Sequence, residues 1–222
     1  MQLPRTAFPG TPVNKGERNR IHAVMSRYER LLERAKSGEF EQDRLSEEEL
    51  AMVAEELRKP ATEADPFTLL DILGHAFAFQ YRELVEWFLD CEDDPMLARL
   101  ALQILCGYWG NTAQYLEEVL RFMRGVPWDQ EEDVRQIAVS EAGEYLRSNT
   151  EPRFLRELIS IFESEDEERS MHEGAYFALA RAVGRDWKDL PSAASHFDLV
   201  TQIDPAVIQV AKERLRRETD KS

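Results

Sequence analysis

The chain has 222 residues, of which 43% are hydrophobic and 32% are charged. A folded chain of this length is one large domain or a short array of repeats, and it buries roughly 70% of its unfolded surface. Asp and Glu (43) outnumber Lys and Arg (28), which gives a formal net charge of −15. This charge argues against binding to nucleic acid through neutralised phosphates, and it favours a basic partner or simply solubility.

The cysteine content and the hydropathy pattern narrow the class of protein further. Cys91 and Cys106 lack the paired spacing of a zinc site and are too few for a disulfide framework, so we expect ordinary reduced thiols. The N-terminus has no apolar core of signal-peptide length, and no apolar run reaches the roughly 18 residues of a membrane span. These features predict a cytoplasmic protein with no membrane partner.

The first part of the chain divides into an arm and two helices. Residues 1–16 are rich in Pro and Gly and predict an irregular arm. Within residues 17–60, apolar residues at three- and four-residue spacing predict an amphipathic helix. Ser46 and Glu49 then form the sequence pattern of a capping box, which predicts a second helix that ends before Pro60.

Residues 61–190 contain a repeated pattern of two amphipathic helices. One series of segments aligns without gaps at a step of 37 residues, and a second series with matching apolar positions lies between them. A two-helix period of about 30 to 45 residues is typical of an α-solenoid, in which neighbouring units stack to bury their faces. The first series is 95–110, 132–147 and 169–184, and the second is 82–88, 117–123 and 156–162.

The last segment, residues 191–222, predicts a helix that caps the array. Asp204 and Pro205 have the residue types of an N-cap and a first helical turn. No segment shows the period-two alternation of a strand. The predicted fold is therefore all-α, an α-α superhelix built as a solenoid of antiparallel helix pairs with extra N-terminal helices.

One unit of this array resembles a HEAT-type repeat. Asp133, Val134, Arg135 and Ala138 match the HEAT pattern of an acidic residue, Val, Arg, two further residues and Ala, and the neighbouring units keep the pattern in part. The resemblance implies a curved helical scaffold that binds other macromolecules along its inner helices, usually without catalysis. Fold analogy alone does not establish function.

Acidic loops precede the inner helix of three units. In a stacked array these loops line one edge, where their charges would merge into an acidic rim that attracts a basic protein. The alternative is that the carboxylates cap helix N-termini and complement the helix dipole. The candidate partner-binding residues of this rim are Glu92, Asp93, Asp94, Glu131, Glu132, Asp133, Glu165, Asp166 and Glu167.

The inner helices and their loops supply three further candidates for partner binding. The repeat register places Arg135 and Tyr176 away from the predicted core, and Tyr176 continues an apolar stripe with Leu102 and Val139. Such a stripe is either a contact surface or packing against the adjacent unit. Trp109 lies in a Gly-flanked loop, where it is either a surface anchor for a partner or a plug for the turn.

Motifs of catalysis and of cofactor or metal binding are missing from the sequence. The four histidines are far apart in sequence, and no metalloprotease, hydrolase, nucleotide or dinucleotide motif occurs. We therefore expect a non-enzymatic protein without cofactor or metal that binds a basic protein partner through the acidic rim and the inner helices. A narrower form of this hypothesis is a toxin-neutralising immunity or inhibitor protein.

Two alternatives to this function remain. HEAT-like arrays also resemble nucleic-acid repair enzymes, but these need a basic groove, and the inner positions supply few cations beyond Arg99 and Arg135. The other alternative is a structural subunit of a larger complex, which would be an obligate oligomer.

Overall fold

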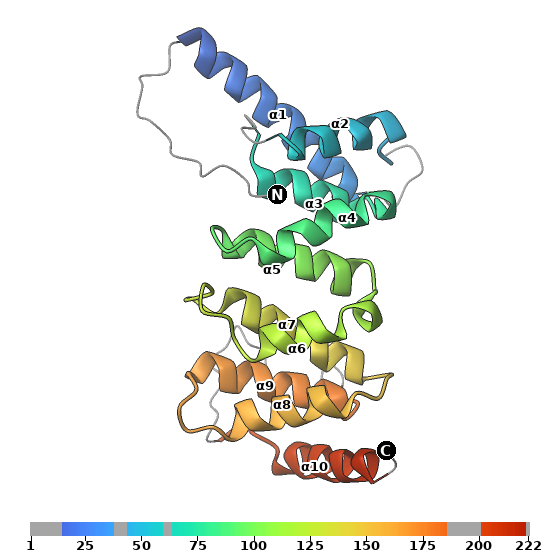
Figure 1. Ribbon diagram of the computed structural model, residues 1–222, viewed down its shortest axis with the longest axis vertical. Coiled ribbons are helices and arrows are strands. Elements are labelled where there is room, and N and C mark those ends of the chain that lie inside the picture. The colour runs from blue at the N-terminus through green and yellow to red at the C-terminus, as the bar shows by residue number, and fades with distance from the viewer. Residues whose placement is uncertain (1–14, 38–43, 60–63, 186–200, 221–222) are drawn as a thin grey trace. The chain divides into compact units, whose positions relative to one another are not determined.

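The computed structural model describes residues 15–37, 44–59, 64–185 and 201–220 (Figure 1). Ten α-helices and several shorter helical segments make up this part of the chain, and it contains no β-strand. The all-α fold class is therefore confirmed. Most of the arm predicted for residues 1–16 lies outside the described residues.

The chain forms two units, Met1–Gly110 and Asn111–Ser222, each with its own set of helix contacts. The division falls within residues 61–190, where the sequence pattern predicts one continuous array. The N-terminal helices belong to the same unit as the first repeat-like segments.

Unit 1 is organised around one helix that is buried along most of its length. Helix α3 packs against α1, α2 and α5, and Leu69, Leu70, Ile72 and Leu73 in α3 are fully buried. The unit comprises α1 (Lys15–Ser37), α2 (Glu47–Leu57), α3 (Pro66–His75), η2 (Phe79–Tyr81), α4 (Arg82–Glu86), η3 (Trp87–Asp90), α5 (Pro95–Leu102) and η4 (Gln103–Tyr108).

The capping box predicted at the start of α2 is confirmed. The backbone N–H of Glu49 donates to the Ser46 hydroxyl at 3.2 Å, and the backbone N–H of Ser46 donates to the Glu49 carboxylate at 2.8 Å. These two bonds satisfy amides that the helix itself leaves without partners.

The segment 95–110 differs from the single helix that its apolar spacing predicts. Helix α5 ends at Leu102 and continues as the π-helical segment η4. The backbone N–H of Trp109 donates to the carbonyl of Ile104, five residues earlier, at 2.9 Å. The wider π turn changes the direction in which the last residues of the segment face, and it brings Tyr108 and Trp109 against the end of α3.

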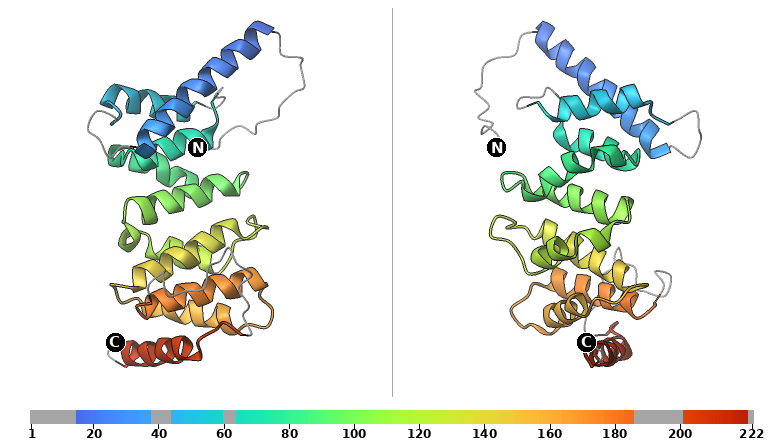
Figure 2. Two further views of the ribbon diagram at one scale, coloured as in Figure 1. Left: turned by 180° about the vertical axis from the view of Figure 1, so that it is seen from behind. Right: turned by 45° about the vertical axis from the view of Figure 1, so that its right-hand side comes forward.

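Unit 2 consists of successive helix pairs. Helix α6 packs against α7, α8 packs against α9, and the most extensive contact in the unit joins α7 to α9. Figures 1 and 2 show these helices in yellow-green to orange. This arrangement is compatible with the predicted two-helix units. The unit comprises η5 (Thr112–Gln114), α6 (Leu116–Met123), α7 (Asp133–Leu146), α8 (Pro152–Glu163), α9 (Arg169–Ala182) and α10 (Pro205–Thr219).

A glycine permits the close approach of α7 and α9. A Cβ added at Gly143 would lie 2.6 Å from the Cα of Ala178, a separation that real Cβ atoms essentially never show. Gly143 and Ala178 are both buried. The two backbones can therefore pack this closely only because both positions carry very small residues.

The helix predicted near the C-terminus is confirmed as α10. The Asp204 carboxylate accepts a hydrogen bond from the backbone N–H of Ala206 at 2.9 Å, and Pro205 follows at the first helical position. Val207 and Ala211 are buried where α10 packs against α8 and α9.

Cys91 and Cys106 are free thiols. No helix in the described part of the chain combines the length and apolarity needed to cross a membrane.

Candidate functional site

The two acidic loops of unit 2 lie together. One loop leads into α7 and the other leads into α9, and the pair is joined by the side chain of Arg135 in the first turn of α7. We call this surface the acidic face. It consists of Glu131, Glu132, Asp133, Arg135, Glu165, Asp166 and Glu167.

Arg135 connects the two loops by ion pairs on both sides. Its Nη1 donates to the Glu132 carboxylate at 2.6 Å and to Glu167 Oε2 at 2.7 Å, and its Nη2 also bonds Glu167. Its Nε donates to the carbonyl oxygen of Met123 at 2.9 Å. The Arg135 side chain is 11% exposed, so these charge-assisted bonds form in a place largely shielded from water.

The loop before α7 is also held by Asp129, which caps the helix. Its buried carboxylate accepts the backbone N–H groups of Val134 and Arg135, both at 3.0 Å. Burial raises the pKa of the Asp129 carboxyl, and these backbone hydrogen bonds oppose the rise. Asp129 therefore serves as a helix cap, which is the alternative interpretation of the acidic loop residues.

The loop before α9 is held by His172, through a contact that the sequence pattern did not predict. The Nε2 atom of His172 lies 2.6 Å from the carbonyl oxygen of Ser164, which fixes the start of the loop against α9. A lone histidine on a helix gives no sequence signal for this bond, because the bond depends on where the loop folds back. Both loops are therefore held by contacts with the helices that follow them, in addition to the Arg135 bridge.

Several carboxylates of the acidic face remain turned to solvent. Glu131, Glu165 and Asp166 are exposed and form no ion pair with any described residue. Their charges are therefore available to a partner. No three His, Cys, Asp or Glu side chains converge as metal ligands in the part of the chain that is described.

The third predicted loop, with Glu92, Asp93 and Asp94, belongs to unit 1. All three residues are exposed. The Asp94 carboxylate accepts the backbone N–H of Met96 at 3.2 Å, so it caps α5. The residues that the structure brings together are thus those of the two unit 2 loops.

The prediction that Tyr176 lies on an accessible stripe with Leu102 and Val139 is wrong. All three side chains are buried, and Tyr176 is 2% exposed. Its hydroxyl oxygen accepts the backbone N–H of Asp204 at 3.0 Å, which links α9 to the start of α10. The stripe is packing within each unit, the alternative that its helical spacing also allowed.

The interpretation of Trp109 as a surface anchor is also wrong. The side chain is 6% exposed, and its Nε1 donates to the carbonyl oxygen of Gly74 at 3.1 Å. Its ring contacts the ring of Phe79 at a centroid distance of 5.2 Å. Trp109 therefore plugs the turn that follows α3 and holds it in place.

Comparison of the chain with models of protein families, with characterised proteins and with solved structures finds no match.

Proposed function

We propose that this protein is a non-catalytic module of HEAT-like helix pairs that binds a basic protein through the acidic face of unit 2. The observation that carries the proposal is the Arg135 bridge, which holds Glu132 and Glu167 and so joins two loops into one surface. Helix capping explains the position of the Asp129 carboxylate. It does not explain the Arg135 bridge or the exposed carboxylates beside it, because a helix cap needs neither of them.

The held loops favour binding because little ordering remains for the partner to impose. Association costs side-chain and loop entropy at an interface, and loops already fixed by Arg135, Asp129 and His172 have less entropy to lose. Exposed carboxylates such as Glu131 and Asp166 then attract basic side chains over a distance and accelerate encounter at low salt.

The same bridge argues against a nucleic-acid partner for this surface. A phosphate-binding arginine needs a free guanidinium, whereas Arg135 is engaged by two carboxylates and a carbonyl oxygen. Other carboxylates surround it, and they would repel a phosphate backbone.

A narrower form of the proposal is a toxin-neutralising inhibitor. A nuclease toxin carries a basic surface to hold its substrate, and an acidic face of this kind can cover that surface. The partner in this case is a basic enzyme whose activity falls when the complex forms.

The test compares two variants with the same change in charge. In the face variant, Glu131, Glu165 and Asp166 are replaced by Lys. In the control variant, the same replacement is made at three other exposed carboxylates that form no ion pair with described residues, Glu55, Glu83 and Asp220. Proteins captured from the native source are identified by mass spectrometry, and the affinity of the purified partner for all three proteins is measured at several salt concentrations.

If the proposal is correct, the captured partner is a basic protein that binds the native protein and the control variant with similar affinity. The face variant should bind at least about tenfold more weakly, and its affinity should depend less on salt, because close charge pairs are lost. Equal binding of all three proteins, or a partner that is not basic, would contradict it. If the captured partner is an enzyme, its activity is then measured with and without this protein. A fall in activity on complex formation is the result expected for a toxin-neutralising inhibitor.

A further inference from the structure

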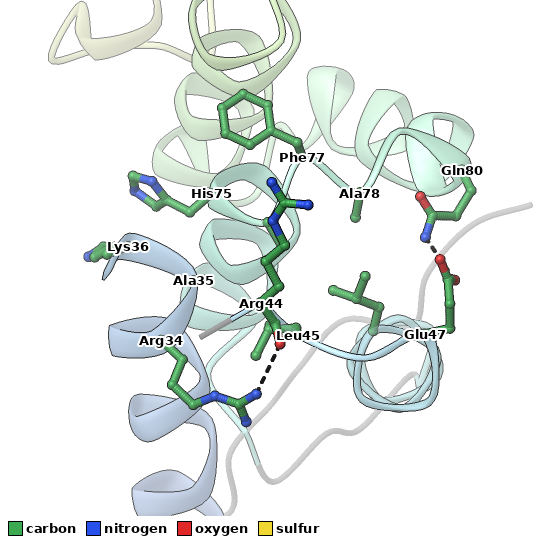
Figure 3. Close-up of a pocket in the computed structure, with 12 residues that line it drawn as sticks. Arg34, Ala35, Lys36, Arg44, Leu45, Glu47, His75, Phe77, Ala78 and Gln80 are labelled. Atoms are coloured by element: carbon green, nitrogen blue, oxygen red, sulfur yellow. Dashed lines mark hydrogen bonds between the residues drawn. The ribbon is translucent and has the colours of Figure 1, made fainter. Parts of the chain in front are cut away.

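Unit 1 contains a cavity of about 650 Å³ between the end of α1, the start of α2 and the turn after α3 (Figure 3). Pockets that hold small organic ligands are typically about 300 to 1,000 Å³ in volume and largely apolar, with a few polar groups. Leu45 and Phe77 supply apolar surface to this cavity, and the buried side chains of Leu50 and Ala78 lie at its border. It therefore has the size and part of the lining of a small-molecule site.

Arg44 is the cation of this cavity that is left for a ligand. Among the lining cations, Arg34 pairs with Glu49 at 2.6 Å and Lys36 pairs with Asp71 at 3.2 Å. Arg44 is exposed and forms no ion pair with any residue in the described ranges. Its carbonyl oxygen accepts a hydrogen bond from Arg34 at 3.1 Å, which anchors its backbone, and in Figure 3 its side chain extends toward Phe77.

Phe77 occupies a backbone position that normally carries glycine. Helix α3 ends in a Schellman motif, in which the N–H of Phe77 donates to Gly74 and the N–H of Ala78 donates to Leu73, both at 3.1 Å. Phe77 has the positive φ of this motif, 51°, which is unfavourable for a bulky residue. Its side chain is nevertheless 54% exposed, so the strain is not compensated by burial in the core.

The turn that carries Phe77 is supported from behind by the π-helical segment. Tyr108 lies against the ring of His75 at a centroid distance of 4.6 Å, and Trp109 bonds the carbonyl oxygen of Gly74. A Cβ at Gly74 would lie 2.6 Å from Ile104, so the segment and the end of α3 fit closely. The turn that carries Phe77 is therefore closely packed from behind, which favours a preformed ligand site.

We propose that this cavity binds a small organic anion with an apolar body. Arg44 pairs with the anionic group, and Phe77 packs on the apolar body together with Leu45. Glu47, which accepts a hydrogen bond from Gln80 at 3.3 Å, lies on the other side of the cavity in Figure 3 and disfavours a second anionic group there. The site is separate from the acidic face and independent of the proposed partner binding.

The probe that tests this proposal is 1-anilinonaphthalene-8-sulfonate, an aromatic anion that fluoresces in apolar surroundings. Its uncharged analogue, N-phenyl-1-naphthylamine, separates the contribution of the charge from that of the apolar body. Both are titrated into the full-length protein under conditions where its circular dichroism shows the native fold. The native protein should bind the sulfonate in a saturable manner at one site and bind the uncharged analogue at least about tenfold more weakly.

Two variants and one control locate the binding. Arg44→Gln removes the cation and should weaken binding of the sulfonate about tenfold or more while leaving the uncharged analogue unaffected. Arg156→Gln makes the same change in charge at an exposed residue of unit 2 and should change neither affinity. Phe77→Gly relieves the positive φ, so it should raise the midpoint of thermal unfolding and still weaken binding of both probes several-fold.

The Phe77→Gly variant distinguishes a ligand wall from a structural residue, because a structural role would lower stability and binding together. Sulfonate binding that is the same in the native protein and in Arg44→Gln would overturn the proposal. So would the absence of saturable binding, or loss of binding in Arg156→Gln equal to that in Arg44→Gln. None of these outcomes bears on the acidic face, whose test uses other variants.

Discussion

At the scale of single residues, Arg135 is the side chain on which the acidic face depends. It satisfies Glu132, Glu167 and the carbonyl oxygen of Met123 in a site largely shielded from water. Removing one partner from a shielded ion pair leaves the others without compensation. We therefore expect Arg135→Ala to lower the free energy of unfolding by about 2 to 4 kcal/mol.

Urea denaturation followed by circular dichroism measures this loss. Arg135→Lys should recover part of it, because lysine keeps the charge but lacks the planar group that bonds several acceptors at once. The exposed Arg156 provides the control, and Arg156→Ala should change stability by less than about 0.5 kcal/mol. A loss for Arg135→Ala no greater than that of the control would show that the bridge contributes nothing to the fold.

We expect the buried carboxyl of Glu141 in α7 to make part of the protein's stability depend on pH. Burial raises the pKa of its carboxyl from 4.5 to about 7, with Arg181 opposing the rise and Glu144 adding to it. Between these values the Glu141 carboxyl is more protonated in the native state than in the unfolded state, so its contribution to stability is most favourable at the acidic end and falls as the pH rises through this range. The ionised form costs up to about 3 kcal/mol at pH 8.

Glu141→Gln removes this cost and should raise the free energy of unfolding at pH 8 by about 1 to 3 kcal/mol while changing it little near pH 5. Denaturation curves recorded at both pH values measure the difference. Glu83→Gln, at an exposed position that forms no ion pair with a described residue, should have little effect at either pH. A gain from Glu141→Gln that is equal at both pH values would mean that the charge is not the cause.

The residues that sequence could predict are those whose contacts are local. Ser46 with Glu49 and Asp204 with Pro205 form caps within a few positions, so the pattern alone identifies them. Trp109 makes its decisive bond to Gly74, thirty-five positions away. The burial of such a side chain depends on which segment folds against it, and one sequence does not specify this.

At the scale of elements, apolar spacing predicted the helices well but not their regularity. The periodic segments 132–147 and 169–184 correspond to α7 and α9. Segment 82–88 is instead divided between α4 and η3, and segment 95–110 is divided between α5 and η4. Spacing reports which face is buried, whereas the choice among α, 3₁₀ and π hydrogen bonds also depends on packing against neighbouring elements.

Two glycines of unit 2 test how closely α7 and α9 pack. Gly143→Ala would place a Cβ 2.6 Å from the backbone of Ala178, so the helices must move apart, and we expect a loss of about 1 to 3 kcal/mol. Gly174→Ala meets only Val139, at 3.8 Å, and should stabilise α9 by up to about 1 kcal/mol because alanine favours the helix. Thermal and urea unfolding measure both. Equal effects of the two substitutions would contradict a close contact specific to Gly143.

At the scale of the whole molecule, the repeat pattern of residues 61–190 does not reveal how the chain divides into units. The alignment of 95–110 with 132–147 places no boundary between these segments, yet the chain divides after Gly110. A sequence repeat shows only that neighbouring segments are similar to each other. The limits of a unit depend instead on which helices contact each other.

The net charge of −15 predicts how stability responds to salt. Repulsion among like charges destabilises the compact state, and raising the salt from about 0.01 M to 0.1 M shortens the screening length from about 30 Å to about 10 Å. Salt also weakens exposed ion pairs such as Arg124–Glu157, but each of these contributes only about 0 to 1 kcal/mol. We therefore expect net stabilisation of about 1 kcal/mol, a rise in the thermal midpoint of about 2 to 4 °C.

Scanning calorimetry in sodium chloride at pH 7 measures this rise, and the face variant identifies its source. With lysine in place of Glu131, Glu165 and Asp166, the net charge is smaller and like charges no longer crowd the two loops. The variant should therefore be more stable than the native protein at low salt and respond less to added salt. A thermal midpoint that falls as salt is added would show that ion pairs stabilise the protein more than the net repulsion destabilises it. In that case the charges of the acidic face would not destabilise the free protein, and a basic partner would gain nothing by neutralising them.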